Sequence, residues 1–237
     1  MPKRGKRYRE VSQMVDRARA YTPDEALALI KEIATAKFDE TVEIHLKTGL
    51  DPRHAEQQIR GSTVLPNGLG KEVRVAVFTE GEPARAATEA GADIVGGDDL
   101  IKRVQDGFTD FDVAIATREM MGKVGALGRI LGPRGLMPNP RSGTVVAPED
   151  VGRVVSEAKR GRVEFRLDRL ANIHAPLGKA SFDTDKLREN MATLIEAVNA
   201  AKPSEAKGAY IRSAALTTTM GPSIRLDVNQ TMAMKTT

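Results

Sequence analysis

The sequence has 237 residues, which is enough for one large domain or two ordinary ones. Hydrophobic residues make up 41% and charged residues 29% of the chain, as in globular proteins, and the lack of Trp implies a mainly aliphatic core. The absence of cysteine excludes disulfides and cysteine metal sites, and no apolar run approaches the ~20 residues that cross a bilayer, so we expect a cytoplasmic protein without a membrane partner.

The formal net charge of +4 is unevenly distributed along the chain. Lys and Arg exceed Asp and Glu by two in residues 1–67 and by three in residues 161–237, whereas residues 68–160 carry one more acid than base. Such asymmetry favours a polyanionic partner for the two ends. Residues 1–9 hold five basic side chains and no acid, which fits either a solvated tail or a basic arm along RNA.

A helix is expected to begin at Thr22, because Thr at the N-cap, Pro at the next position and Glu25 form a helix-start signature. Apolar residues then recur at helical spacing, and the helix is expected to end near Ala36. Residues 42–47 alternate between apolar and polar side chains, which predicts a half-buried strand. Phe38 is either a core residue or a stacking platform, and the core is the usual place for a lone Phe.

Residues 53–60 are polar, and the Gly-rich residues 66–70 after them are interpreted as a linker. After this linker the hydrophobic pattern changes. Short apolar runs alternate with helical stretches, the second of which is expected to have an Asp-rich cap. The apolar runs are residues 73–78, 94–95 and 112–117, and the helical stretches are residues 82–90 and 98–105. Strands and helices in alternation are typical of a parallel α/β sheet.

Half-buried alternation returns at residues 162–168, which predict an antiparallel strand. Its partner strand is expected around Ile173, followed by a turn at residues 176–179. A further helix is expected to begin at Asp183 or Thr184. Two-layer α+β structure is therefore predicted for this part of the chain.

The stretch TTTMGPSIRLD, residues 217–227, combines small hydroxyl side chains, a methionine and a Gly-Pro pair with a short alternating run. One interpretation is a hairpin corner, in which Gly221 and Pro222 form a turn or bulge before a strand. The other is a surface that fits a nucleic-acid groove. Hydroxyls and backbone amides bond phosphate and sugar, and glycine allows close approach of two backbones.

The domain organisation follows from the distribution of apolar residues. Residues 1–67 supply too little apolar area for an independent core, but together with residues 161–237 they supply enough for a two-layer domain. The predicted fold class is α/β and α+β: a discontinuous two-layer α+β domain of residues 1–67 plus 161–237, with an inserted Rossmann-like α/β domain of residues 68–160. Hinges are expected near residues 68–70 and residue 161.

Catalytic signatures are missing. The histidines His45, His54 and His174 have no metal-ligand spacing, His45 is expected to face solvent, and no G-x-S-x-G motif is present. The glycines at three-residue spacing from Gly122 to Gly128 lack the full phosphate-loop signature, so packing or turn glycines are favoured. We expect no catalytic residue, no metal and no cofactor.

Two other function classes are alternatives. A nucleotide-binding α/β enzyme would need a phosphate loop directly after Phe78, where the chain instead has an acidic segment, residues 79–82. A protein–protein scaffold would bind a protein partner with little dependence on salt. Residues 120–148 contain basic side chains and no acid, which fits a solvated loop or a basic patch; the basic residues are Lys123, Arg129, Arg134 and Arg141.

Four long motifs, KFDETVEIHLKTGLDPR, LGRILGPRGLMPNP, GRVEFRLDRLANIHAPLGKASF and TTTMGPSIRLD, together cover widely separated parts of the chain. With these motifs in this order, the sequence resembles the bacterial large-subunit ribosomal protein L-one family over essentially its whole length. The resemblance implies a discontinuous domain that binds the mobile stalk of large-subunit ribosomal RNA near the tRNA exit site. It also implies contact with exit-site tRNA, release of deacylated tRNA, repression of translation of its own messenger RNA, and a monomer outside the ribosome.

The resemblance also implies an RNA-binding surface. Carried over position by position, its residues are Lys37, Phe38, Thr41, Arg166, Asp168, Arg169, Ser213, Thr217, Thr219, Met220 and Gly221. The group of Arg166, Asp168 and Arg169 is expected to adjoin Lys37, Phe38 and Thr41, and the acids Glu40, Glu43 and Asp168 are expected to hold basic groups in place. The chain departs from the family at Asn67 and at residues 170–172, and both departures are expected to affect only hinge behaviour.

Overall fold

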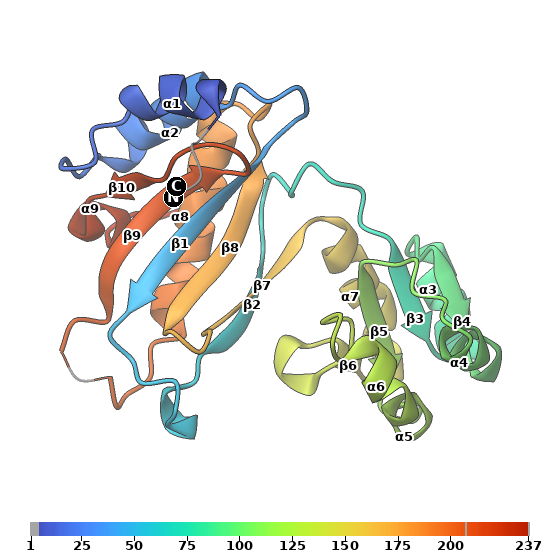
Figure 1. Ribbon diagram of the computed structural model, residues 1–237. Helices are drawn as coiled ribbons and strands as arrows, with labels where there is room; N and C mark the ends of the chain where they lie inside the picture. The colour runs from blue at the N-terminus through green and yellow to red at the C-terminus, as the bar shows by residue number, and fades with distance from the viewer. Residues whose placement is uncertain (1–4, 207, 237) are drawn as a thin grey trace. The chain divides into compact units, whose positions relative to one another are not determined.

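The computed structural model describes residues 5–206 and 208–236 of the chain. The chain forms two compact units, one of Met1–Gly70 and Val163–Thr237 and the other of Lys71–Arg162 (Figure 1). The first unit is therefore assembled from both ends of the sequence, and the second lies between them in the chain.

The first unit is built on a four-stranded antiparallel sheet with the order β10-β9-β1-β8. Its strands are β1 (Thr41–Thr48), β8 (Asn172–Lys179), β9 (Ile211–Thr218) and β10 (Ile224–Leu226). Strict alternation in β1 buries Val42, Ile44 and Leu46 on one face. In Figure 1 helix α8 (Thr184–Ala200) crosses behind the strands, and its buried side chains join the same hydrophobic core as those of β1.

Helix α2 (Pro23–Ile33) begins as predicted. The Thr22 hydroxyl oxygen accepts a hydrogen bond from the Glu25 backbone N–H at 3.3 Å, and the Glu25 carboxylate accepts one from the Thr22 N–H at 3.1 Å. This reciprocal capping satisfies two backbone donors that the first helical turn leaves open. The helix ends at Ile33, before the predicted Ala36, because the Ala36 N–H bonds the Glu40 side chain instead of a helical carbonyl.

In the described part of the first unit, two short helices were not predicted. Helix α1 (Lys6–Gln13) occupies part of the basic N-terminal segment, and Val11 anchors it in the core. Residues 1–4, the rest of that predicted arm, lie outside the described residues. Helix α9 (Val228–Met232) follows β10 directly, with the Asp227 side chain accepting the Gln230 N–H at 3.0 Å.

The predicted pairing around Ile173 is wrong. Strand β7 (Arg162–Arg166) pairs with β2 (Arg60–Val64) in a separate two-stranded sheet, and β8 pairs with β1. Leu167, the residue after β7, forms a single antiparallel bridge with Ile173 of β8, and the predicted pairing is found at that point alone among the described residues. Strand β2 escaped prediction because its sequence, RGSTV, shows no apolar alternation.

The turn predicted at residues 176–179 is instead part of β8. This strand lies at the edge of the sheet, where Pro176 can be tolerated without its N–H. A register shift opposite Val42 and Glu43 bulges the strand at this point, and Gly178 adopts φ 153°. Edge position and bulge together explain how a Pro-Leu-Gly sequence continues a strand.

The second unit contains a parallel sheet with the order β4-β3-β5-β6, so the alternating α/β pattern is confirmed. Its strands are β3 (Val75–Phe78), β4 (Ile94–Gly96), β5 (Val113–Thr117) and β6 (Val145–Val146). Its helices are α3 (Glu82–Glu89), α4 (Asp98–Gln105), α5 (Met121–Val124), α6 (Gly128–Leu131) and α7 (Val151–Lys159). Short 3-10 turns complete the chain: η1 (Ala55–Gln57), η2 (Gly125–Leu127), η3 (Pro140–Ser142) and η4 (Pro148–Asp150).

The predicted Asp-rich cap of α4 is wrong, because Asp98 is the first helical residue and Gly97 is the N-cap. The Asp99 carboxylate accepts the Gly97 N–H at 2.9 Å. None of the helices in the described parts of the chain combines the length and apolar character that a membrane crossing requires.

Candidate nucleic-acid interface

The face of the four-stranded sheet opposite the core is polar. The alternation that buries Val42, Ile44 and Leu46 leaves Glu43, His45 and Lys47 on the other face of β1. In the sheet register, Thr217 of β9 lies opposite Glu43, Ser213 of β9 lies opposite Lys47, and His174 of β8 lies opposite His45. The alternation of β1 and the sheet register therefore place hydroxyl, imidazole and ammonium groups of β1, β8 and β9 on one surface.

Two histidines meet in the middle of this face. The Nδ1 atoms of His45 and His174 are 2.7 Å apart, and His45 Nε2 lies 3.0 Å from the Thr217 hydroxyl. A hydrogen bond between two Nδ1 atoms requires one of them to carry no proton. Burial lowers the pKa of His45, with a further lowering by His174, while Glu43 acts in the opposite direction. His45 lies on the face of β1 opposite the core, as predicted, but His174 and Thr217 contact it there and its side chain is only 30% exposed.

One end of the face carries two exposed apolar side chains. Phe38 is 54% exposed and Met220 is 49% exposed, so the assignment of Phe38 to the core is wrong. Lys37 precedes Phe38 and is exposed as well. The β9–β10 connection also confirms the hairpin interpretation of residues 217–227, since the two strands pair antiparallel on either side of Met220.

Backbone and hydroxyl contacts fix this end of the sheet. The Thr219 N–H donates to the Thr41 carbonyl at 3.1 Å, and the Thr219 hydroxyl oxygen accepts the Thr41 N–H at 3.0 Å. Lys179 donates to the Thr41 hydroxyl at 3.0 Å and adds a cation that sequence reasoning missed. Gly221 packs so closely that a Cβ there would lie 2.4 Å from the Thr218 hydroxyl oxygen.

The group around Asp168 lies at the other end of the sheet, contrary to prediction. Because β8 is antiparallel to β1, the residues just before β8 lie beside the C-terminal end of β1, and Thr41 lies at its N-terminal end. Eight residues of strand separate these ends by roughly 23 Å. Asp168 and Arg169 therefore do not adjoin Phe38, and Arg166 belongs to the two-stranded sheet of β2 and β7.

Asp168 organises the turn that leads into β8. Its Oδ1 accepts the backbone N–H groups of Leu170 at 2.8 Å and Asn172 at 2.7 Å, and its Oδ2 lies 3.3 Å from His174 Nε2. Burial opposes ionisation, but the hydrogen bonds from Asn172, Leu170 and His174 outweigh it and lower the pKa of Asp168 to about 2. The carboxylate thus holds its own turn and also contacts the His174 imidazole.

The departure from the family pattern at residues 170–172 belongs to this turn. Ala171 takes a left-handed conformation with φ 60°, and its carbonyl accepts bonds from the backbone and hydroxyl of Thr48. The turn lies at the end of the polar face, and the expectation that this departure affects only hinge behaviour stays a prediction.

The comparison of the sequence with known proteins identifies the family. The sequence profile of the ribosomal protein L1p/L10e family matches residues 30–222. The chain belongs to this family. It is 57% identical to the large ribosomal subunit protein uL1 of Dehalococcoides mccartyi, over 97% of each chain. It is 58% identical to the uL1 proteins of Chloroflexus aggregans and Chloroflexus aurantiacus, with 96% of this chain covered in both cases and 97% and 96% of theirs.

Family membership decides the class of the protein. It is a ribosomal protein and not an enzyme. The described residues contain no cluster of three or more His, Asp and Glu side chains arranged to hold a metal ion. In the second unit, Gly122 and Gly128 lie in short helices and Gly125 lies in the 3-10 turn η2. An added Cβ would meet nothing within 4 Å at any of them, so close packing does not require glycine there.

Two of the basic residues in this stretch have hydrogen-bond partners within the second unit. Lys123 donates to the Asp98 carboxylate at 2.7 Å, which raises the pKa of Lys123. Arg134 donates to the Thr109 hydroxyl, and Arg129 lies on α6. The side chain of Arg141 lies outside the described residues.

Proposed function

We propose that the protein binds the mobile stalk of large-subunit ribosomal RNA near the tRNA exit site, through the unit of Met1–Gly70 and Val163–Thr237. The observation that carries this proposal is the pair of exposed apolar side chains, Phe38 and Met220, beside Lys37 and a hydroxyl-rich strand end. Exposed large apolar groups on a polar, basic surface mark an interaction site.

The chemistry of the face supports a structured RNA. Hydroxyls, ammonium groups and backbone amides bond phosphates, sugars and 2′-OH groups. Among the described residues, the face has no row of exposed aromatic side chains for stacking successive bases. Phe38 and Met220 would contact the shallow minor groove or a splayed base, while Lys37 and Lys179 neutralise phosphates. The expected mode is recognition by shape.

The proposed roles in translational repression and in tRNA release use the same surface. A stalk-like site in the protein's own messenger RNA would occupy Phe38 and Met220 in place of ribosomal RNA, so free protein would repress its own translation. On the ribosome, in the cytoplasm, the stalk-bound protein would contact exit-site tRNA and assist release of deacylated tRNA. Both roles fit a protein that is monomeric outside the ribosome.

We also propose that Lys71–Arg162 is a Rossmann-like domain inserted into a discontinuous RNA-binding domain. Its parallel sheet has an apolar cluster on each face, one containing Phe78 and Leu100 and the other Val77 and Val151. That is the arrangement of a doubly wound α/β domain. The chain segments at its two ends, near Gly70 and Arg162, would act as hinges.

The test is a titration with a stalk fragment of large-subunit ribosomal RNA across a salt series. Met220→Ala is the variant and Met14→Ala is its matched control, since the two methionines are 49% and 46% exposed. We expect Met220→Ala to bind about tenfold more weakly, with Met14→Ala unchanged. Thr219→Val should weaken binding by about 1–3 kcal/mol, because loss of the hydroxyl removes the acceptor of the Thr41 N–H and a hydrogen-bond partner for an RNA group.

Four outcomes would contradict the proposal. Wild-type protein that binds no stalk fragment removes the function itself, and salt-insensitive binding to a protein would favour a scaffold. Full affinity in Met220→Ala and Thr219→Val moves the site elsewhere. A variant in which a short linker replaces residues 71–162 should retain binding; if it loses binding, the site belongs to the second unit.

A further inference from the structure

Two imidazole rings face each other on the polar face of the four-stranded sheet. His45 of β1 and His174 of β8 are direct cross-strand partners, and their Nδ1 atoms are 2.7 Å apart. The ring centroids are 4.9 Å apart, and the ring planes are inclined to each other by 65°. The pairing of the two strands therefore directs both Nδ1 atoms into the same small region.

The partners of the two Nε2 atoms determine where the ring protons lie. His174 Nε2 is 3.3 Å from Asp168 Oδ2, and because an ionised carboxylate only accepts hydrogen bonds, His174 carries its proton on Nε2. In the neutral ring, Nδ1 of His174 is then bare and accepts the hydrogen of His45 Nδ1. His45 Nε2 is bare in turn and accepts the Thr217 hydroxyl hydrogen at 3.0 Å. A single proton therefore lies between the two Nδ1 atoms.

A transition-metal ion can replace this shared proton. Neutral imidazole nitrogen is a preferred ligand of Zn²⁺. Two Zn–N bonds of about 2.0–2.1 Å at a tetrahedral angle place the nitrogens roughly 3.3 Å apart, so the rings need to separate by only roughly 0.6 Å. The proton of His45 moves from Nδ1 to Nε2, where the Thr217 hydroxyl oxygen can accept it in a hydrogen bond. The neutral pair thus binds a metal without losing a proton.

The surroundings of the pair match those of metal-bound histidines. A ligating histidine generally donates its other ring N–H to a carboxylate or another oxygen, which fixes the orientation of the ring. Asp168 provides the carboxylate for His174, and Thr217 provides the oxygen for His45. Asp168 is itself held by two backbone N–H groups of its own turn. Both rings therefore have a partner that favours ligation through Nδ1.

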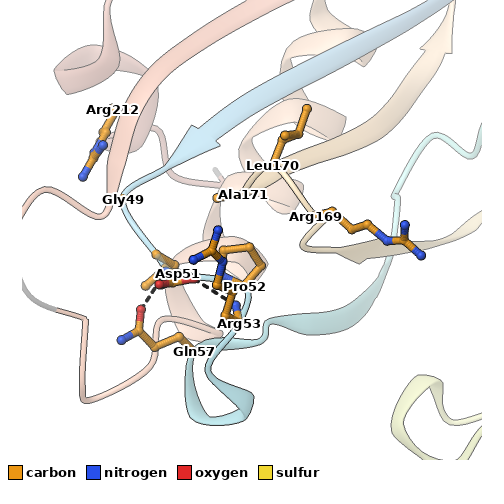
Figure 2. Close-up of a pocket in the computed structure, with 10 residues that line it drawn as sticks. Gly49, Asp51, Pro52, Arg53, Gln57, Arg169, Leu170, Ala171 and Arg212 are labelled. Carbon is orange, nitrogen blue, oxygen red and sulfur yellow. Dashed lines mark hydrogen bonds between the residues drawn. The ribbon is translucent and has the colours of Figure 1, made fainter.

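The charges beside the pair are compatible with a bound cation. Glu43, two residues before His45 on the same face of β1, has its carboxylate 3.9 Å from His45 Nε2 and adds a negative charge. Lys47, two residues after His45, is engaged elsewhere, because its Nζ donates to the Leu170 carbonyl. Figure 2 shows Leu170 in the turn that precedes β8.

We propose that His45 and His174 bind one divalent transition-metal ion, of the class of Zn²⁺, through their Nδ1 atoms. Two protein ligands are fewer than a dedicated zinc site has, so water, which reaches the 51% exposed side chain of His174, fills the other positions and leaves the metal exchangeable. Spacing along the chain could not reveal this pair, because 129 residues separate the two histidines. The inference does not depend on the proposed RNA binding.

The test is a calorimetric titration of the full-length protein with Zn²⁺, after removal of metal with a chelator and without a histidine tag. The chain has three histidines and no cysteine, so single variants cover every histidine. His45→Ala and His174→Ala should each bind Zn²⁺ about tenfold more weakly or less, whereas His54→Ala, at a 68% exposed side chain outside the pair, should match wild type. Thr217→Val should bind about tenfold more weakly, because His45 Nε2–H loses its acceptor. Mg²⁺, which prefers oxygen ligands, should not bind to the pair.

The ring nitrogen resonances of wild-type protein labelled with ¹⁵N give a readout that no folding defect of a variant affects. Zn²⁺ should move the Nδ1 resonances of His45 and His174 to those of metal-bound nitrogens and leave the His54 resonances unchanged. Unchanged rings at His45 and His174 in excess Zn²⁺, or wild-type affinity in the His45→Ala/His174→Ala double variant, would overturn the proposal. Because no RNA is present in the titration, failure of the proposed RNA binding leaves this result unaffected.

Discussion

The Glu40 carboxylate accepts the backbone N–H of Met220 at 2.8 Å, across 180 residues of sequence. Its other oxygen accepts the Ala36 N–H at 2.9 Å, and the side chain is only 2% exposed. One buried carboxylate therefore joins the segment that carries Phe38 to the turn that carries Met220. This contact explains why the two exposed apolar side chains lie at one end of the sheet.

Replacing Glu40 should weaken both the fold and the RNA site. Glu40→Ala leaves two backbone N–H groups unpaired, so we expect the free energy of unfolding to fall by about 1–3 kcal/mol. Urea denaturation followed by circular dichroism measures this change. Glu32→Ala, on the exposed face of α2, is the matched control. A Glu40→Ala protein as stable as the Glu32→Ala control would show that the carboxylate does not hold the two segments together.

Gly221 should not tolerate a side chain unless the Thr218 side chain moves or is removed. The added Cβ of Gly221→Ala would meet the buried Thr218 hydroxyl oxygen at 2.4 Å, and we expect a loss of about 1–3 kcal/mol in unfolding free energy. That oxygen has no hydrogen-bond partner among the described residues, so Thr218→Ala should cost little and restore part of the loss in the double variant.

Gly122→Ala is the control for this cycle, because a Cβ there meets nothing within 4 Å and alanine favours a helix. It should leave stability unchanged or raise it slightly. Additive losses in the Gly221→Ala/Thr218→Ala double variant, measured by thermal or urea unfolding, would contradict the proposed collision.

The His45–His174 contact should make stability depend on pH. The folded-state pKa of His45 lies below its ordinary 6.5, so the unfolded chain binds more protons as pH falls through 6.5. The free energy of unfolding should therefore fall from pH 7 downwards until His45 titrates in the folded state. His45→Gln should flatten this dependence in urea unfolding at a series of pH values. Equal slopes for wild type and variant would show that the contact does not affect protonation.

Asp168 should contribute to stability at a lower pH. Its folded-state pKa of about 2 lies below the ordinary 3.8, so its contribution is full above pH 3.8 and is lost as pH falls through 2. Because the side chain is 35% exposed, we expect this contribution to be about 1 kcal/mol. Asp168→Asn should lose it, whereas Asp183→Asn, at a 77% exposed side chain, should not. Identical acid unfolding curves for wild type and Asp168→Asn would contradict the assignment.

Local sequence patterns predicted helices and strands well where the apolar residues of a segment recur at one regular spacing or where a capping signature is present. The alternation of residues 42–47 predicts β1, and the capping signature at Thr22 predicts the start of α2, because both depend on neighbouring residues. The same reasoning failed for β2, which has no alternation, and for Pro176, which lies in a strand only because that strand is at a sheet edge with a bulge.

The sequence by itself determined three things: the presence of α+β and α/β structure, the polar face of β1, and the family. Periodicity and long motifs, on which these depend, are properties of the chain. Only the tertiary structure decided which residues share a surface. His45 meets His174 across 129 residues, Glu40 meets Met220, and Asp168 lies a strand length away from Thr41. Strand order and direction set these distances, and they are fixed by packing between distant segments rather than by any local pattern.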